Sequence, residues 1–254
     1  LSPHRQQLRL ELSVRRALIE TRAQYVTTAR GLVRAMGNTI PACECDTFVR
    51  YARRASLTET ARTPIEPLLL VLEQVQHQLV LVERRIEELC AEEPAIALLT
   101  TVPGVGLIVA AAFVSVIDEA HRFRSAHRVG AYLGLVPSEK SSGDRRRIGS
   151  ITKQGNSYMR ALLIQSAWVM LGPAGRGDPL SRWGQAVARR RTKKIAAIAV
   201  ARRLAGILWA MWRDGPVYHP IYVPQTSAQG LQRQAQSAEA QAAALKRAAA
   251  KVNR

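Results

Sequence analysis

Apolar residues recur at intervals of three and four along most of this chain, the spacing that places them on one face of an α-helix. The first such segment opens at Ser2-Pro3, where serine suits the N-cap and proline suits the first helical position. It should continue to about Met36, because Gly37 then favours a helix end. Its remaining positions are rich in arginine, which fits a solvent-exposed face and a nucleic-acid-binding face equally well.

A polar connector follows at residues 38–60, with one short helix expected around residues 48–53. A second long helix should begin at Thr63-Pro64-Ile65-Glu66, where an N-cap threonine, a proline and a glutamate have the order of a capping box. Pro94 is expected to close it. Its apolar residues alternate threes and fours, which is typical of a coiled coil: Ile65, Leu68, Leu72, Val75, Leu79, Val82, Ile86 and Leu89.

Two partners could cover this apolar seam. The first helix of the same chain would pack on it in an intramolecular hairpin, whereas a second copy of the chain would make it a homo-oligomer interface. We expect a homo-oligomer, and the hairpin stays open as the alternative.

A glycine-containing turn at residues 102–106, Val-Pro-Gly-Val-Gly, separates two apolar segments in a helix-hairpin-helix pattern. Gly104 and Gly106 have no Cβ, so they can adopt positive φ and let backbone N–H groups at the start of the second helix approach an anion. The helix dipole favours negative charge at the same place. We therefore expect a nucleic-acid phosphate to bind here.

The pattern as a whole predicts a mainly α fold, with long coiled-coil helices followed by a compact helical domain that carries the helix-hairpin-helix and a basic serine-bearing loop. Strand-type alternation is absent outside a short pairing that residues 136–151 allow. We place the coiled-coil region at residues 1–93 and the compact domain at residues 94–222. Residues 223–254 are an Ala/Gln-rich tail, either disordered or frayed helix.

Charge narrows the class of partner. The 254 residues include 37 Lys or Arg against 19 Asp or Glu, a formal net charge of +18, which suits a polyanion such as nucleic acid. An anionic membrane would attract the same charge, but the sequence has no uninterrupted apolar run of about 18 residues and no signal-peptide pattern. We therefore expect a cytoplasmic, nucleoid-associated bacterial protein with no membrane partner.

The C-terminal half concentrates this charge. Helices are expected near residues 180–190 and 192–212, and residues 181–213 contain nine Lys or Arg and no Asp or Glu. Their apolar positions supply a core face and their basic positions a phosphate-binding face. Cys43, Cys45 and Cys90 are too few for a disulfide framework and lack the usual zinc-ligand spacing.

Several short motifs follow one another between residues 134 and 160. They are Gly-Leu-Val-Pro at 134–137, Ser142-Gly143, an arginine cluster at 145–147, Lys-Gln-Gly-Asn at 153–156 and Met159-Arg160. In this order they resemble the C-terminal domain of DEDD-type insertion-sequence transposases, the insertion sequence one-ten family that includes the bridge-RNA-guided recombinases. The resemblance extends over roughly residues 1–220.

The resemblance implies a function and a site. It makes Ser142 the nucleophile that attacks DNA, and it makes the basic residues beside it a binding surface, together with the glycine turn: Gly104, Gly106, Arg145, Arg146, Arg147, Lys153 and Arg160. On the residues alone, a Ser-Ser-Gly-Asp-Arg loop is more often a solvated turn. A guide RNA is a further partner that the family suggests.

The family also carries an N-terminal RuvC-like domain whose carboxylates hold a divalent metal, expected to be Mg²⁺. This chain starts at about the point where that domain should end, so we expect it to lack the domain. Asp144, Asp178 and Asp214 are the only carboxylates of residues 140–214 and each lies in a turn-like context, so we expect no acidic metal site there either. No cofactor is therefore expected within the chain. Two interpretations remain: a DNA transposase that forms a covalent serine–DNA intermediate, and a non-catalytic nucleic-acid-binding remnant or fragment.

The charge pattern predicts DNA binding that is largely non-specific and weakens steeply with salt. Each neutralised phosphate contributes about 0.9 to the slope of log affinity against log salt, so six contacts give a slope of about −5. Titration of one duplex at several salt concentrations measures that slope, and a flat dependence would exclude the basic surface as a binding face.

Overall fold

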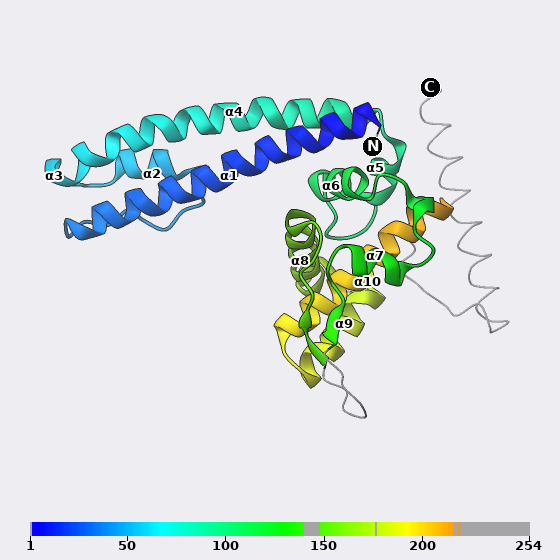
Figure 1. The fold of residues 1–254 in the computed structure, drawn as a ribbon. Coiled ribbons are helices and arrows are strands. Elements are labelled where there is room, and N and C mark those ends of the chain that lie inside the picture. Colours follow the sequence, from blue (N-terminus) through cyan, green and yellow to red (C-terminus); the bar gives the residue numbers. More distant parts are fainter. Residues whose placement is uncertain (1, 140–147, 176, 216–217, 219–254) are drawn as a thin grey trace, which may run out of the picture.

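The computed structural model describes residues 2–139, 148–175, 177–215 and 218 (Figure 1). The fold is mainly α, as the sequence predicts, and its regular elements are α1 Pro3–Ala35, α2 Phe48–Arg54, α3 Glu59–Arg62, α4 Glu66–Ala91, α5 Pro94–Leu99, α6 Leu107–Ile117, α7 Ala126–Tyr132, β1 Pro137–Glu139, β2 Ile148–Ile151, α8 Ser157–Leu171, α9 Pro179–Arg190 and α10 Lys193–Asp214. The predicted tail at residues 223–254 lies outside the described residues.

Helices α1 and α4 form a long antiparallel pair that extends away from the remaining helices, with α2 and α3 at its far end (Figure 1). The predicted start of α1 is confirmed, since the Ser2 hydroxyl accepts a hydrogen bond from the backbone N–H of Arg5 at 3.3 Å. Gly37 ends the helix with φ of +69°, a conformation that glycine adopts without strain.

The apolar seam of α4 packs against α1 of the same chain, which is the intramolecular alternative. A homo-oligomer remains a prediction, and burying this seam does not require one. The buried positions also differ at both ends, where Leu69 and Cys90 replace the expected Leu68 and Leu89. Leu68 and Leu89 lie beside these residues and are partly buried against the cores that contain Leu69 and Cys90, respectively.

The predicted capping box at Thr63 is wrong. Residues 63–65 form a single 3₁₀ turn that joins α3 to α4 in one helical path. The Thr63 hydroxyl donates to the carboxylate of Glu59 at 3.1 Å instead of capping α4. Pro94 likewise begins α5 rather than simply closing α4, which ends at Ala91. Proline has no N–H to lose at a first helical turn. Pro64 therefore lies inside the continuous path from α3 to α4, whereas Pro94 begins a new helix after the extended residue Glu93.

Polar contacts fix α1 against α4. Arg15 pairs with Glu83 at 2.8 Å, and Arg85 donates to both carboxylate oxygens of Glu11 at 3.0 and 3.2 Å. Exposed pairs of this kind contribute only about 0–1 kcal/mol each. Their main effect is to fix the register of α1 against α4. The guanidinium groups of Arg15 and Arg85 are thereby used in contacts within the chain.

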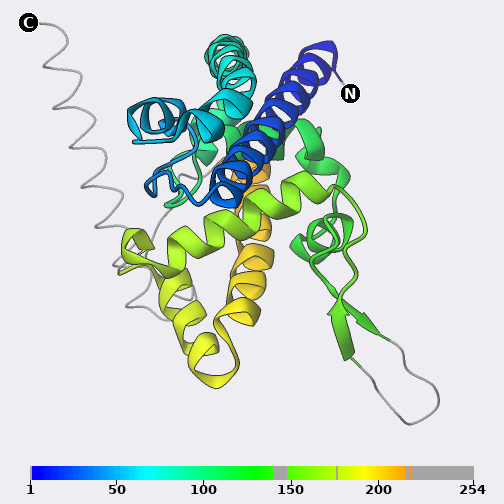
Figure 2. The ribbon, with the colours of Figure 1, turned by 90° about the vertical axis from the view of Figure 1, so that its left-hand side faces the viewer.

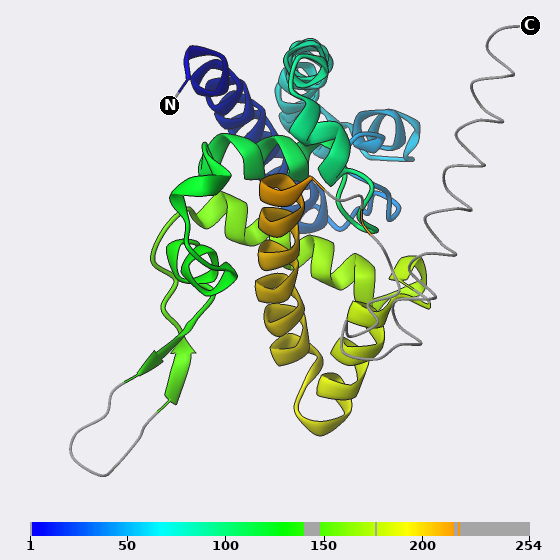
Figure 3. The same ribbon diagram turned by 90° about the vertical axis from the view of Figure 1, so that its right-hand side faces the viewer.

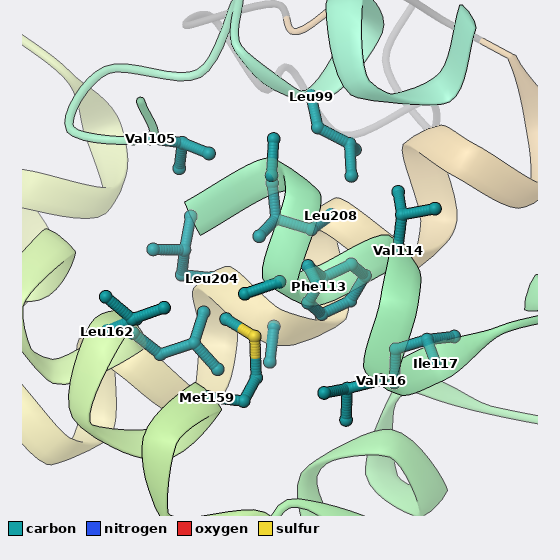
Figure 4. Packing of buried hydrophobic residues seen from close by; sticks show 14 of the residues in the cluster. Leu99, Val105, Phe113, Val114, Val116, Ile117, Met159, Leu162, Leu204 and Leu208 are labelled. Atoms are coloured by element: carbon teal, nitrogen blue, oxygen red, sulfur yellow. The ribbon is translucent and has the colours of Figure 1, made fainter. Parts of the chain in front are cut away.

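The compact domain is built around α6. All residues from Ala110 to Ile117 are buried, because α5, α8 and α1 pack on different sides of this short apolar helix. Figure 4 shows Phe113 of α6 facing Met159 of α8 and Leu204 and Leu208 of α10. The same core continues into the base of the hairpin, with buried side chains from both long helices: Leu8, Leu12, Val82, Ile86 and Cys90.

Arg5 joins these parts at the base of the hairpin. Its guanidinium donates to Glu93 Oε2 at 2.8 Å and to the backbone carbonyl of Asp118, which ends α6 with φ of +64°. It also lies 5.2 Å from the ring centre of Trp212 in α10. The expected domain boundary lies between residues 93 and 94. The partly buried Arg5 side chain contacts helix ends on both sides of it, at Glu93 and at Asp118.

Two helical stretches, residues 59–91 and Lys193–Asp214, are long and apolar enough to cross a membrane by length and composition alone. In α10, 56% of the relevant window is buried against the other helices of this fold. Packing in the core therefore accounts for the apolar character of α10.

A buried carboxylate organises the far end of the domain. Asp178 is the N-cap of α9, and its Oδ1 accepts from the backbone N–H groups of Leu180 and Ser181 at 2.8 and 3.2 Å. Its Oδ2 accepts from the hydroxyl of Tyr218 at 2.6 Å. Burial, reinforced by the bond to Asp178, raises the pKa of Tyr218 above its usual value. Asp178 was predicted to lie in a turn. In the structure it caps helix α9 and also binds Tyr218, which follows α10 in the chain.

Tyr218→Phe should lower the free energy of unfolding by about 1–2 kcal/mol, because the buried carboxylate loses one hydrogen bond. Since the folded state holds the Tyr218 proton more tightly, this contribution is complete below the unfolded pKa of about 10 and is lost as the pH rises above it. Urea denaturation of both proteins at pH 8 and at pH 11 measures the difference.

Tyr25→Phe is the matched control, since Tyr25 packs on the hairpin core and its hydroxyl has no partner among the described residues. A stability difference for Tyr218→Phe that is the same at both pH values would contradict the role given to the Asp178 bond.

Candidate nucleic-acid interface

A two-stranded ribbon extends from the helical domain at the motifs singled out in the sequence (Figures 2 and 3). Strands β1 and β2 are antiparallel and pair Pro137 with Ile151 and Glu139 with Ile148. The pairing confirms the short strand segment that the sequence allowed. The hydroxyl of Ser138 adds a hydrogen bond to the carbonyl of Ser150 at 2.9 Å. The segment between the strands contains four predicted site residues that lie outside the described residues: Ser142, Arg145, Arg146 and Arg147.

The two flanking motifs meet at the base of this ribbon. The N–H of Thr152 donates to the carbonyl of Val136 at 2.9 Å, and the N–H of Lys153 donates to the carbonyl of Gly134 at 3.1 Å. A Cβ on Gly134 would overlap the carbonyl oxygen of Gln154. Gly-Leu-Val-Pro and Lys-Gln-Gly-Asn, whose first residues are nineteen positions apart, are thus held together by backbone contacts.

A second glycine contact lies beside the first. A Cβ on Gly155 would overlap the carbonyl oxygen of Tyr132, and both Gly134 and Gly155 have positive φ, +69° and +94°. No L-residue side chain fits at either place, which explains the glycine in each motif. We call this set of contacts among residues 132–136 and 152–155 the ribbon clamp.

Arg160 and Asn156 connect the ribbon clamp to α8. Asn156 is the N-cap of α8, and its Oδ1 accepts from the N–H of Met159 at 2.8 Å. The guanidinium of Arg160 donates to the carbonyls of Leu133 and Gln154 at 3.1 and 3.5 Å. Arg160 was predicted to bind nucleic acid, and its guanidinium is already engaged with a backbone oxygen of the Lys-Gln-Gly-Asn motif and with that of Leu133, the residue before Gly-Leu-Val-Pro.

Lys153 lies at the same base with an exposed side chain and φ of +57°. It has no ion pair among the described residues. A left-handed conformation costs a non-glycine residue roughly 1–2 kcal/mol, and the bond from its N–H to Gly134 helps to hold it there. Of the predicted basic residues that the structure describes, Lys153 is therefore the one whose side chain is open to a phosphate.

The glycine turn lies at the other end of α8. Gly104 has φ of +80°, and a Cβ there would be 3.0 Å from the carbonyl oxygen of Ser166 and 3.2 Å from Met170 Cγ. Gly106 is the N-cap of α6, with open space where a Cβ would project. Because Ser166 and Met170 follow Arg160 by six and ten residues of helix, about 9–15 Å separates the two parts of the predicted site along α8.

Packing therefore explains Gly104, because its missing Cβ lets the turn approach α8. Gly106 is exposed and fits the predicted anion site better. Helices α5 and α6 do contact each other across this turn, although α5 has only six residues.

Two further basic surfaces accompany the ribbon. The turn between α9 and α10 is exposed and carries five basic side chains, Arg189, Arg190, Arg191, Lys193 and Lys194. Figures 2 and 3 show this turn and the ribbon projecting on the same side of the helical domain, away from the α1–α4 pair. A polyanion along this side could contact both.

The second surface was missed by sequence reasoning. Arg122, Phe123, Arg124 and Arg128 line an open groove at the start of α7, which we call the α7 groove. The guanidinium of Arg122 lies 4.7 Å from the ring centre of Phe123 and 4.9 Å from that of Tyr132. Sequence signals were present in the Arg-Phe-Arg triplet and in the four-residue spacing of Arg128 and Tyr132.

Within residues 2–139, 148–175, 177–215 and 218, no three His, Cys, Asp or Glu side chains gather closely enough to hold a metal ion. Cys90 is buried, and burial raises the pKa of its thiol to about 11, which suits a packing role rather than a ligand.

The model of the Transposase IS116/IS110/IS902 family matches residues 96–177, which include the glycine turn, the ribbon clamp and all of α8. This part of the chain is therefore similar to the transposase domain of that family. Helices α1, α4 and α10 lie outside the matched residues. The matched residues coincide with the centre of the continuous core, and the hairpin and the last helix pack around them.

Curated relatives carry the same kind of name. A probable family 20 transposase of Pseudomonas aeruginosa is 30% identical over 214 residues, 82% of this chain and 63% of the relative. The transposases for insertion sequence elements IS1111A of Coxiella burnetii and IS1328 of Yersinia enterocolitica are each 26% identical, over 79% and 81% of this chain. The chain spans 63%, 57% and 62% of the length of these three relatives.

The ribbon clamp predicts a large difference between two glycine substitutions with the same φ of +69°. Gly37→Ala should cost about 1 kcal/mol of folding free energy from backbone strain alone, since open space surrounds that position. Gly134→Ala should cost at least about 3 kcal/mol, because the new methyl group also overlaps backbone that cannot move without breaking the clamp. Urea denaturation measures both, and equal costs would show that the clamp is not tightly formed.

Proposed function

We propose that this chain is part of an insertion-sequence DNA transposase that binds DNA and exchanges strands through Ser142. The metal-binding acidic domain that the family resemblance implies would act from outside these residues. The observation that carries the proposal is the ribbon clamp. It uses the motif residues on both sides of the serine segment to fasten that segment's two ends to the core of the transposase domain.

Restraint of the ribbon where it leaves the domain matters for the proposed attack of Ser142 on DNA. A nucleophile contributes most when it is held close to the reacting atom and in line with the bond that breaks. The clamp contacts fix Val136 to Thr152 and Gly134 to Lys153, and the strands β1 and β2 carry that constraint outward. The constraint therefore reaches Glu139 and Ile148, the two described residues that flank the serine segment.

The proposed reaction is a transesterification. The Ser142 hydroxyl oxygen forms a bond to a DNA phosphorus, the phosphorus–oxygen bond to one deoxyribose breaks, and the serine proton is transferred to the departing oxygen. Arg145, Arg146 and Arg147 would stabilise the negative charge that develops on the phosphoryl oxygens. Attack by a hydroxyl of another strand reverses the step and releases the serine, so no bond energy is consumed overall. A divalent metal bound to the acidic domain would neutralise part of the same charge.

DNA binding is proposed to use the side of the domain that bears the ribbon and the α9–α10 turn. Lys153 and the five basic residues of that turn are exposed there, from Arg189 to Lys194. Contacts from such side chains to phosphates position a duplex without reading its sequence. The guide RNA remains a proposed partner on the resemblance alone.

The proposed homo-oligomer needs a surface other than the filled seam of α4. Leu70, Val71 and Val80 are 53%, 41% and 41% exposed on the outside of the hairpin. These side chains are the apolar positions of α4 that a second copy of the chain could cover.

The nucleophile is tested with a protein that also contains the acidic domain, incubated with insertion-sequence DNA and Mg²⁺. Ser142→Ala should abolish the covalent protein–DNA adduct on a denaturing gel and leave DNA affinity within about twofold, since one hydroxyl adds little beside the basic surface. Ser141→Ala is the matched control and should retain the adduct.

Persistence of the adduct in Ser142→Ala would contradict the catalytic assignment. A wild-type protein that binds DNA and forms no adduct under these conditions would favour the alternative, a non-catalytic nucleic-acid-binding remnant or fragment.

A further inference from the structure

The α7 groove combines aromatic rings with uncompensated positive charge. Phe123 and Tyr132 pack edge to face, with ring centres 5.3 Å apart, and Arg122 lies over both rings. Tyr132 is 42% exposed. Arg124 and Arg128 are exposed beside them.

The charges of this groove are not used in holding the fold together. Arg122, Arg124 and Arg128 form no ion pair with any described residue, and no carboxylate lines the groove. By contrast, Arg5, Arg15 and Arg85 are paired with glutamates elsewhere in the chain. Three unpaired guanidinium groups beside an exposed ring indicate a ligand with both negative charge and a flat apolar face.

An unpaired nucleotide strand has that combination. Its phosphates bind guanidinium groups, and its bases stack on aromatic rings and on arginine planes. The bases of a duplex are stacked on each other and cannot reach a ring on the protein surface in the same way. An acidic peptide would satisfy the charges and leave the ring face without a partner.

The position of the groove points to the same ligand. Helix α7 ends at Tyr132, whose carbonyl oxygen contacts Gly155 in the ribbon clamp. Figure 3 shows α7 directly beside the base of the ribbon. Strand exchange separates DNA strands, so unpaired nucleotides would arise next to a reaction centre carried by the ribbon.

We propose that the α7 groove binds single-stranded DNA. A base stacks on Tyr132 and on the Arg122 plane that covers it, and the neighbouring phosphates contact Arg124 and Arg128. The argument from position rests on the proposed strand exchange, whereas the argument from charge and aromatic rings does not. The single-strand site and the proposed reaction can therefore fail separately.

The test compares the affinity of the full chain for a fluorescent oligo-dT 20-mer and for a 20-base-pair duplex at one salt concentration. Tyr132→Leu should weaken single-strand binding about tenfold, the effect expected for loss of one stacked base, and change duplex binding less than twofold. Tyr51→Leu is the matched control, because Tyr51 is 38% exposed and lies under Arg50 on the distant helix α2. It should change neither affinity.

A second measurement is independent of the stability of a variant. Oligo-dT that contains 5-iodo-deoxyuridine should crosslink on irradiation to a peptide containing Phe123 or Tyr132 in the wild-type chain. The double variant Arg124→Gln, Arg128→Gln should reduce crosslinking and weaken single-strand binding by more than duplex binding.

Several outcomes would overturn the proposal. They are an unchanged single-strand affinity in Tyr132→Leu, an equal loss for duplex and single strand, and crosslinks confined to other peptides. A Tyr132-dependent preference for oligo-rU over oligo-dT of more than tenfold would assign the groove to RNA instead. Normal single-strand binding without any protein–DNA adduct in the full transposase would leave this site standing and refute the proposed reaction.

Discussion

At Gly134 and Gly155 the backbone passes so close to Gln154 and Tyr132 that no side chain can be accommodated. Both glycines have positive φ, so two independent requirements, conformation and space, select the same residue at each place. The close approach lets the N–H groups of Thr152 and Lys153 reach carbonyls of the preceding motif. The direction in which the ribbon leaves the domain depends on these few contacts.

The ribbon clamp is useful only if its support is rigid. Asn156 and Arg160 connect it to α8, and α8 packs on α6 and α10 in the core. The core extends without interruption to Leu8 and Leu12 of the hairpin, and Arg5 fastens the ends of α5 and α6 at the same junction. Burial of some 35 side chains in one cluster makes the hairpin base and the compact domain a single packed unit. A force applied along the hairpin would therefore reach the ribbon through packed helices.

Much of this arrangement could be predicted from local signals. Helices α9 and α10 lie where helices were expected near residues 180–190 and 192–212, and the end of α1 follows from one glycine. The sequence did not predict the joint at Thr63, where α3 runs into α4 without a break. A capping sequence can also occur inside a bent helical path, so it does not always mark a helix start. The partner of the α4 seam could not be chosen either, since the same apolar repeat suits any helix.

Site prediction reached the right segment but could not assign each residue's task. Arg160 and Gly104 belong to motifs that suggest phosphate binding, yet their contacts are with backbone oxygens and with α8. A one-dimensional pattern gives no information on which arginine is already engaged with a carbonyl. The α7 groove was missed for the converse reason, because Arg122 and Tyr132 are ten residues apart and become neighbours only when η2, residues Ala120–Arg122, folds against α7.

The central claim is that the motifs around the serine segment form a rigid clamp. Native-state hydrogen exchange tests it directly, because the N–H groups of Thr152 and Lys153 donate across the clamp at 2.9 and 3.1 Å. A formed clamp predicts that these two amides exchange as slowly as core amides of α6 and α10, with opening free energies close to that of global unfolding. Exchange of both amides at the rate of an open loop, while the core amides of α6 and α10 stay protected, would contradict the account.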